Sequence, residues 1–243
     1  MGMRDRSRIP LSFLHCRNIA MAYALPGGLS FCVAGDRLVF LDLPSDRYFC
    51  LSPAIEADFR DLIEGRSPGH SASRRLQSGN LLIADARAND ITPCIIPAVA
   101  GELVKQPENL AALDGLAAIG WILRCRTELK VRGLAATIQH LIDRKAAVGK
   151  THAVPDAAAA RERKLLRVAG SFAVASGIID THGRCLPWSL AIAHRLLSLG
   201  ITPLLVLGVR LTPFAAHAWV QVGGTLINEC RERTDVFTPI LVV

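Results

Sequence analysis

Two reactive side chains in the C-terminal third of the chain, Cys185 and His217, lie 32 positions apart. Pro187 suits the first turn of a helix and Gly200 suits a helix end, so the sequence predicts a helix with Cys185 at its N-terminus. Unpaired backbone N–H groups and the helix dipole at this position stabilise a thiolate, the nucleophilic form of cysteine. The same N–H groups can hold the oxyanion that forms when a thiolate attacks a carbonyl carbon.

A thiolate nucleophile needs a base that later protonates the leaving amine, and His217 is the candidate. Residues 217–222 alternate as a strand does, and we expect the strand to begin at His217. Gly223-Gly224 then predicts a turn, after which residues 225–229 return as the second strand of a hairpin. The sequence therefore predicts a cysteine and a histidine held by a helix end and a strand.

The third member of the site depends on the register of this hairpin. With a two-residue loop, Val222 pairs with Thr225, and Asn228 lies on the face that His217 shares. With a three-residue loop that includes a bulge, Glu229 stands directly opposite His217. One residue of slip exchanges the two candidates. Either side chain can fix the tautomer of the imidazole, but only Glu229 would also stabilise the imidazolium ion.

The first third of the chain has its own pattern of short elements. Residues 29–34 and 37–43 predict a hairpin, and residues 47–51 predict a third strand. Ser52 and Pro53 then begin a helix that ends near Gly65, and a shorter helix follows at residues 72–77. Such a set of elements is typical of a small winged-helix module. Helical spacing returns in three later segments, at residues 110–131, 133–146 and 161–175.

Composition limits the classes of protein. The chain has 243 residues, of which 51% are hydrophobic, enough for one large or two modest domains. Its mean hydropathy is +0.32, but no apolar run approaches the roughly 18 residues of a spanning helix. The N-terminus lacks the uniform apolar segment of a secretory signal, so we expect a cytoplasmic protein without a membrane partner.

Cysteine usage and charge add two further limits. The seven cysteines are scattered and include no Cys-x-x-Cys pair, which argues against a disulfide framework or a zinc ribbon. His182 and Cys185 have a ligand-like spacing but no second pair, so we expect neither a metal nor another cofactor. A net charge of +7 can favour nucleic acid, although solvated helix faces explain it more simply. We expect no nucleic-acid partner.

Two stretches of sequence resemble known families. GDRLVFLDLPSDRYFCLSP, residues 35–53, resembles the leader-peptide recognition (RRE) domain of ribosomal peptide biosynthesis. In that family a leader peptide adds as a strand to the edge of the small sheet, with side-chain pockets selecting its sequence. Arg47 and Tyr48 are the candidate leader contacts. Without this resemblance, the default interpretation of a winged helix would be DNA binding.

The second stretch resembles the leader peptidases of lasso-peptide biosynthesis, called B proteins. The resemblance rests on the Arg-Cys-Leu-Pro-x-Ser-Leu-Ala block at residues 184–191, the Leu-x-x-Gly at 197–200 and His217-Ala218-Trp219-Val220. It implies an α+β fold in which a leader-recognition domain precedes a transglutaminase-like, papain-like domain with a Cys, His, Asp triad. The family's aspartate falls at Glu229. The implied catalytic residues are therefore Cys185, His217 and Glu229.

The resemblance also implies an activity and a set of partners. Such a protein binds the leader of a lasso precursor, hydrolyses the leader–core bond and passes the core to an ATP-dependent, asparagine-synthetase-like cyclase. The expected division of the chain is an N-terminal segment at 1–24, a recognition domain at 25–86, a connection at 87–108 and a protease domain at 109–243. Two other classes stay open: an acyltransferase of transglutaminase type, and a non-catalytic protein that binds the precursor or nucleic acid.

Overall fold

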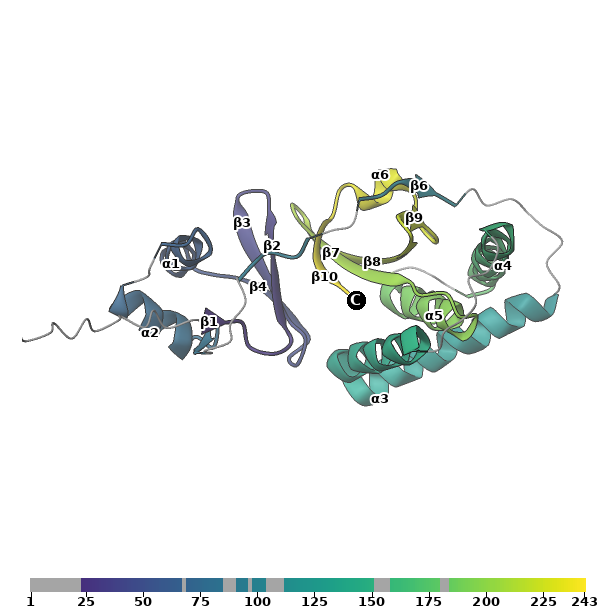
Figure 1. Ribbon diagram of the computed structural model, residues 1–243, viewed down its shortest axis with the longest axis horizontal. Coiled ribbons are helices and arrows are strands. Elements are labelled where there is room, and N and C mark those ends of the chain that lie inside the picture. The colour runs from purple at the N-terminus through teal and green to yellow at the C-terminus, as the bar shows by residue number, and fades with distance from the viewer. Residues whose placement is uncertain are drawn as a thin grey trace, which may run out of the picture.

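The computed structural model describes residues 23–66, 69–84, 91–95, 98–103, 112–150, 158–179 and 184–243. Of the predicted N-terminal segment, only residues 23 and 24 belong to this set, and His182 lies outside it. Figure 1 shows the N-terminal elements on one side of the molecule and the long helices with the second sheet on the other. Among the residues that the structure describes, no helix is long and apolar enough to cross a membrane.

The N-terminal sheet is an antiparallel meander of three strands. These strands are β2 (Leu29–Ala34), β3 (Arg37–Asp42) and β4 (Arg47–Cys50), within one residue of the predicted bounds at each end. Gly35, with a φ of 63°, makes the tight turn between β2 and β3. β4 forms one edge of the sheet, and in the described part of the chain no strand pairs with its outer side.

Two helices cover one face of this sheet, α1 (Pro53–Ile63) and α2 (His70–Ser78). Phe59 of α1 and Leu76 of α2 pack with Phe31, Leu38 and Phe40 in one apolar cluster. A short pair of strands, β1 (Tyr23–Ala24) and β5 (Ile83–Ala84), completes this part of the molecule. Both helices were predicted, with small differences at their ends.

The opposite face of the N-terminal sheet packs against the rest of the chain. Its residues Cys32, Ala34, Val39 and Leu41 belong to the same buried cluster as the C-terminal helices and strands. β2 and β3 lie against β10, so the small sheet is sandwiched between its own helices and the second sheet (Figure 1). The two parts of the chain therefore share one continuous core.

The second sheet has five strands in the order β10-β7-β8-β9-β6. They are β6 (Gly101–Glu102), β7 (Leu204–Leu211), β8 (Phe214–Val222), β9 (Thr225–Leu226) and β10 (Thr238–Val242). β6 pairs in parallel with β9, although it comes from the segment expected to connect the domains. The long antiparallel pair of β7 and β8 forms the centre of the sheet and carries His217.

One long helical element, α3 (Ala112–Lys150), reverses direction at Gly133, where φ is 76° and ψ is 174°. Two contacts across the reversal show that its halves run antiparallel. Glu128 lies 2.5 Å from His140, and the guanidinium of Arg144 lies 5.7 Å from the ring centre of Trp121. The two helices predicted for this region are therefore present as a helical hairpin. α4 (Ala158–Ser176) follows it.

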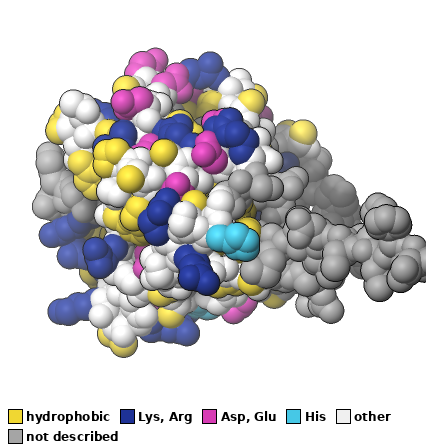
Figure 2. Space-filling view, turned by 90° about the vertical axis from the view of Figure 1, so that its left-hand side faces the viewer, with side chains coloured by type: hydrophobic (Ala, Val, Ile, Leu, Met, Phe, Trp, Pro, Cys, Tyr) yellow, Lys and Arg dark blue, Asp and Glu magenta, His cyan; other side chains and the backbone are white. Residues whose placement is uncertain are grey.

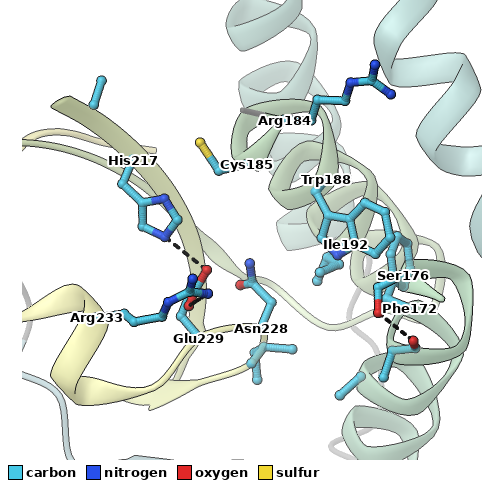
Figure 3. A pocket seen from close by; sticks show the side chains of 14 residues that line it. Phe172, Ser176, Arg184, Cys185, Trp188, Ile192, His217, Asn228, Glu229 and Arg233 are labelled. Atoms are coloured by element: carbon cyan, nitrogen blue, oxygen red, sulfur yellow. Dashed lines mark hydrogen bonds and ion pairs between the residues drawn. The ribbon is translucent and has the colours of Figure 1, made fainter. Parts of the chain in front are cut away.

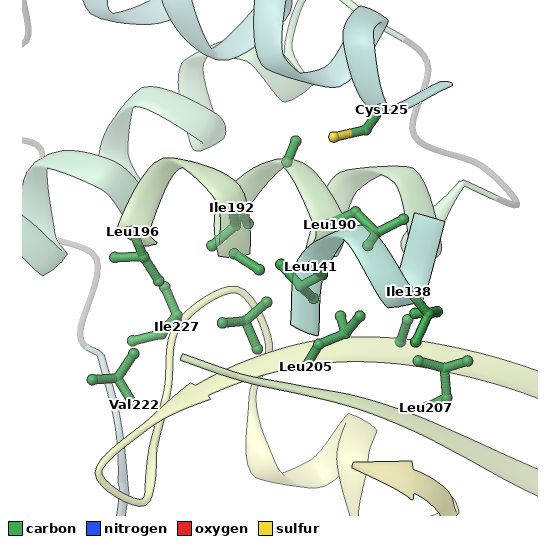
Figure 4. Packing of buried hydrophobic residues seen from close by; sticks show 14 of the residues in the cluster. Cys125, Ile138, Leu141, Leu190, Ile192, Leu196, Leu205, Leu207, Val222 and Ile227 are labelled. Atoms are coloured by element: carbon green, nitrogen blue, oxygen red, sulfur yellow. The ribbon is translucent and has the colours of Figure 1, made fainter. Parts of the chain in front are cut away.

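The helix that begins with the candidate nucleophile, α5 (Cys185–Ser198), lies in the middle of the C-terminal core. Figure 4 shows Leu190, Ile192 and Leu196 of α5 among side chains of α3 and of the β7–β8 sheet. All three side chains are fully buried. This helix is consequently fixed on several sides, which gives Cys185 a rigid support. A last short helix, α6 (Arg231–Thr234), leads into β10.

Candidate active site

Cys185 is the first residue of α5, as the sequence predicted. Its side chain is partly buried, and the backbone N–H groups of Ala218 and Leu186 bond to its sulfur. Arg184, at the N-cap position, makes no side-chain capping bond. In the first turn the N–H of Leu186 bonds to the sulfur, the N–H of Trp188 bonds to the carbonyl of Arg184, and Pro187 has no N–H. The Leu186 N–H and the positive end of the helix dipole therefore favour a negative charge on Cys185.

His217 lies inside β8 and does not begin it. The strand starts at Phe214, because the antiparallel ladder with β7 continues to the pair of Leu211 and Phe214. The imidazole packs against the rings of Trp219 and Phe237, with centroid distances of 6.1 and 5.2 Å. The predicted start of the strand was therefore wrong, while the predicted strand position of the histidine is correct.

Glu229 is the carboxylate that reaches the histidine. Its Oε1 lies 2.9 Å from Nε2 of His217, and its side chain is 11% exposed. Figure 3 shows His217 and Glu229 facing each other, with Cys185 on the other side of the imidazole. The structure thus brings together the three residues that the resemblance implied.

The backbone arrangement that places Glu229 beside His217 differs from the prediction. Val222 pairs with Thr225 across a two-residue Gly223-Gly224 turn, which is the register expected to favour Asn228. β9, however, ends at Leu226, so the chain leaves the ladder before Asn228. The predicted strand at residues 225–229 is therefore too long. Once the chain is free of the ladder, strand alternation no longer decides which side chain meets His217.

Electrostatic contacts favour the charged form of both reactive groups. Burial acts to raise the pKa of Cys185, but the hydrogen bond and charge of His217 and the N–H groups of Ala218 and Leu186 lower it below its ordinary value. Burial acts to lower the pKa of His217, whereas its bonds to Cys185 and Glu229 raise it to about 9. A thiolate and an imidazolium ion are therefore the favoured pair near neutral pH.

A pocket of about 450 Å³ opens beside this pair. Cys185, His217 and Glu229 line one side of it, and α4 and α5 supply an apolar wall that includes Phe172, Trp188 and Ile192 (Figure 3). Two basic residues, Arg184 and Arg233, also line it. Its volume is in the range of pockets that hold a small ligand or a few residues of a peptide.

Two features that shape the site were missed by the sequence prediction. Gly208 lies opposite His217 in the β7–β8 ladder, and a Cβ at this position would come within 2.8 Å of the ring of Trp219. Phe237, which packs on His217, comes from the segment before β10. Both depend on contacts between residues distant in sequence, and no local pattern marks them.

The two predicted leader contacts lie in β4, at the edge of the N-terminal sheet. Arg47 is exposed, while the ring of Tyr48 packs on Phe214 at the start of β8, with centroids 5.7 Å apart. Burial raises the pKa of Tyr48 to about 12, and the charges of Asp46 and Cys185 act in the same direction. Tyr48 thus lies at the boundary between the N-terminal sheet and the strand that carries His217. The role of Arg47 and Tyr48 in leader binding stays a prediction.

A second polar cluster lies between α3 and α5, where Glu128, His140 and His194 place possible ligand atoms within 4.8 Å of one another. Arg144 donates to Nδ1 of the buried His194 at 2.8 Å. Burial and the charge of Arg144 lower the pKa of His194 to about 4. Glu128 already pairs with His140 and Arg132. A guanidinium ion beside these groups opposes a metal cation, and the contacts fit a polar network that joins two helices.

Comparison with known proteins agrees with this architecture. Residues 122–242 match the family model of the transglutaminase-like superfamily. This part of the chain, which contains Cys185, His217 and Glu229, belongs to that superfamily. The α+β class and the transglutaminase-like nature of the C-terminal part are thus confirmed.

A curated relative shows more specifically which proteins this chain resembles. The chain is 43% identical over 56 residues to the Microcin J25-processing protein McjB of Escherichia coli. The match covers 23% of this chain and 27% of that protein, so the chain spans about a quarter of the length of the relative. Together with the superfamily match, it confirms the predicted resemblance to the lasso-peptide B proteins. No solved structure matches the chain significantly.

Proposed function

We propose that this protein is a cysteine peptidase that hydrolyses the leader–core bond of a lasso-peptide precursor. The observation that carries the proposal is the arrangement of Cys185, His217 and Glu229 on a pocket of about 450 Å³. A relative named for processing microcin J25 supports a peptide substrate. The core peptide then passes to an ATP-dependent cyclase, which is the partner that the resemblance implies.

The chemistry follows from the charged pair. The Cys185 thiolate attacks the scissile carbonyl carbon, and the positive end of the α5 dipole stabilises the resulting oxyanion. When the C–N bond breaks, the His217 imidazolium donates its proton to the leaving amine. His217 then takes a proton from water, which hydrolyses the thioester and releases the leader. Glu229 orients the imidazole and stabilises its positive charge throughout.

Recognition of the leader is assigned to the N-terminal sheet. The outer side of β4 offers backbone N–H and C=O groups with no strand partner in the described part of the chain, as strand addition requires. Tyr48 of β4 contacts Phe214, which lies three residues before His217 in β8. A leader held along β4 would therefore lie next to the element that carries the catalytic base. We keep residues 25–86 as the proposed recognition domain and 109–243 as the proposed protease domain.

The surface over α1 and α2 does not favour the nucleic-acid alternative. Figure 2 shows Lys and Arg side chains on this face mixed with acidic and hydrophobic ones. Arg66 pairs with Asp61 at 2.5 Å, and Arg75 pairs with Asp58 at 2.6 Å. Since these cations are already neutralised by neighbouring carboxylates, they are poor phosphate ligands.

The test is to incubate the purified chain with the precursor peptide encoded near its gene and to follow the masses. We expect release of intact leader and intact core by the wild type and not by Cys185→Ala or His217→Ala. A product that keeps both parts and gains an amine would instead identify an acyltransferase. Tight leader binding without cleavage under any condition, including with the cyclase present, would rule out the peptidase.

A further inference from the structure

A small network of hydrogen bonds joins α5 to β8 directly beside the reactive pair. Ser189 Oγ donates to the carbonyl of Ala218 at 2.9 Å. Asn228 Oδ1 accepts from the N–H of Val220 at 2.9 Å, and its Nδ2 donates to Ser189 Oγ at 3.2 Å. Neither Ser189 nor Asn228 takes part in the proposed chemistry. These two residues are called the Ser189–Asn228 link below.

The position of Ser189 couples it to Cys185. The two residues are four positions apart on α5 and therefore lie on the same face of the helix, one turn apart. Ala218, which follows His217, uses its N–H toward the sulfur of Cys185 and its carbonyl toward Ser189. In an antiparallel strand both groups of one residue point to the same edge. The helix therefore holds this one residue of β8 at two successive points.

The side chain of Asn228 takes the place of a backbone partner that β9, which ends at Leu226, does not supply to β8. Ile227 donates its N–H to the carbonyl of Val220 at 3.0 Å, which continues the β8–β9 ladder for one bond. The N–H of Val220 is bonded instead by the side chain of Asn228. The backbone can therefore leave the sheet without an unpaired donor on β8. The next residue, Glu229, is then free to meet His217.

We infer that Ser189 and Asn228 are positioning residues that set the distance and angle between the Cys185 thiolate and the His217 imidazolium, an inference that rests on the proposed peptidase. Ser189 is fully buried, so its bond to the strand does not compete with bulk water. The link joins all three supports of the site: α5 with Cys185, β8 with His217, and the segment with Glu229. A shift of about 1 Å between such groups can cost about 10²-fold in rate.

The first measurement needs no substrate. We would follow alkylation of Cys185 by iodoacetamide against pH and quantify it by peptide mass spectrometry, because other described cysteines are also free thiols. Ser189→Ala and Asn228→Ala should move the midpoint of Cys185 alkylation to higher pH, since the thiolate loses its close contact with the imidazolium ion. Ser171→Ala is the matched control: this buried serine bonds within α4, to the carbonyl of Val168.

The second measurement uses the precursor peptide. For both variants of the link we expect kcat to fall about 10- to 10²-fold with KM changed less than about 2-fold, because the groups that bind substrate remain. The double variant should be no worse than the worse single one, since the residues act as one unit. Folding is checked by the thermal midpoint of each variant.

Variants that melt as the wild type does and keep its alkylation profile would overturn the inference. If Ser189→Ala does not fold, Asn228→Ala decides alone, because Asn228 is only half-buried and water can replace its amide. If the wild type cuts no precursor, the proposed function is refuted. If the two variants still shift the alkylation profile of Cys185 in that case, the positioning role remains in place.

Discussion

At the scale of single residues, the site depends on one carboxylate. The pKa of His217 is raised to about 9 against the effect of burial, by its bonds to Cys185 and Glu229. The pKa of Cys185 is lowered largely by the same histidine. Glu229 therefore acts on the thiolate indirectly, by keeping its partner protonated. The longer glutamate at the place of the family's aspartate still reaches the imidazole at 2.9 Å.

Glu229→Gln should lower the pKa of His217, because an amide can accept the same hydrogen bond but carries no negative charge. We expect kcat/KM for the precursor at pH 7 to fall about 10²- to 10⁴-fold, the range for a disturbed general acid–base. Glu232→Gln, which removes an exposed carboxylate in α6, is the control. A Glu229→Gln enzyme with wild-type activity would show that another group orients His217, and Asn228 would be the first to examine.

The pH profile of the wild type follows from the same shifts. Because the pKa of His217 is raised to about 9, the imidazolium ion persists through neutral pH and is lost as the pH rises through that value. Because the pKa of Cys185 is lowered, the thiolate already exists below the ordinary titration range of cysteine. We expect a bell-shaped profile of kcat/KM whose alkaline limb has its midpoint near pH 9. An alkaline limb centred near the ordinary value for histidine would contradict the thiolate–imidazolium pair.

At the scale of elements, local signals were sufficient for some parts of the site and not for others. Pro187 and Gly200 located α5, and therefore the helix start at Cys185, because both residues act through their own backbone. The choice between Asn228 and Glu229 could not be made in this way. It depends on where β9 leaves the sheet, which long-range packing decides and strand periodicity does not encode.

The same contrast holds for the rest of the fold. β2, β3 and β4 form a meander with short turns, so alternation and turn residues were enough to predict them. β6 has two residues and pairs with β9, which is more than 120 positions away along the chain. No local pattern specifies such a pair. The sequence thus predicted the helix and strand that carry Cys185 and His217, but not the tertiary contacts that orient them.

The reversal of α3 depends on one glycine. Gly133 has a φ of 76° and a ψ of 174°, a conformation that is essentially restricted to glycine and costs another residue about 1–3 kcal/mol. Gly133→Ala should therefore lower the thermal midpoint by about 2–12 °C for a chain of this length. Gly120→Ala, at an exposed helical position with open space around its Cβ, is the matched control and should stabilise the protein by up to about 1 kcal/mol. Equal effects of the two changes in differential scanning calorimetry would show that the reversal tolerates a side chain.

At the scale of the whole molecule, the two parts of the chain are joined by a shared core. Cys32, Val39 and Leu41 of the N-terminal sheet belong to one buried cluster with Leu190 of α5 and Val209 of β7. A flexible linker would allow the N-terminal sheet and the C-terminal part to move apart, whereas a common core holds them in one arrangement. The edge of β4 is therefore held near the site, and under the proposed function leader binding and cleavage would be coupled by geometry.

Leu41→Ala tests this coupling. The side chain is fully buried at the shared core, and its truncation should cost about 2–5 kcal/mol. The three tryptophans, Trp121, Trp188 and Trp219, all lie in the C-terminal part, so their fluorescence reports unfolding of that part alone. If the core is one cooperative unit, Leu41→Ala lowers the urea midpoint of tryptophan fluorescence even though the change is in the N-terminal sheet.

Val33→Ala, on the same sheet but 39% exposed, is the control and should change stability by less than about 1 kcal/mol. A tryptophan midpoint that Leu41→Ala leaves at the wild-type value would mean that the two parts unfold independently, and the geometric coupling of recognition to cleavage would have to be abandoned.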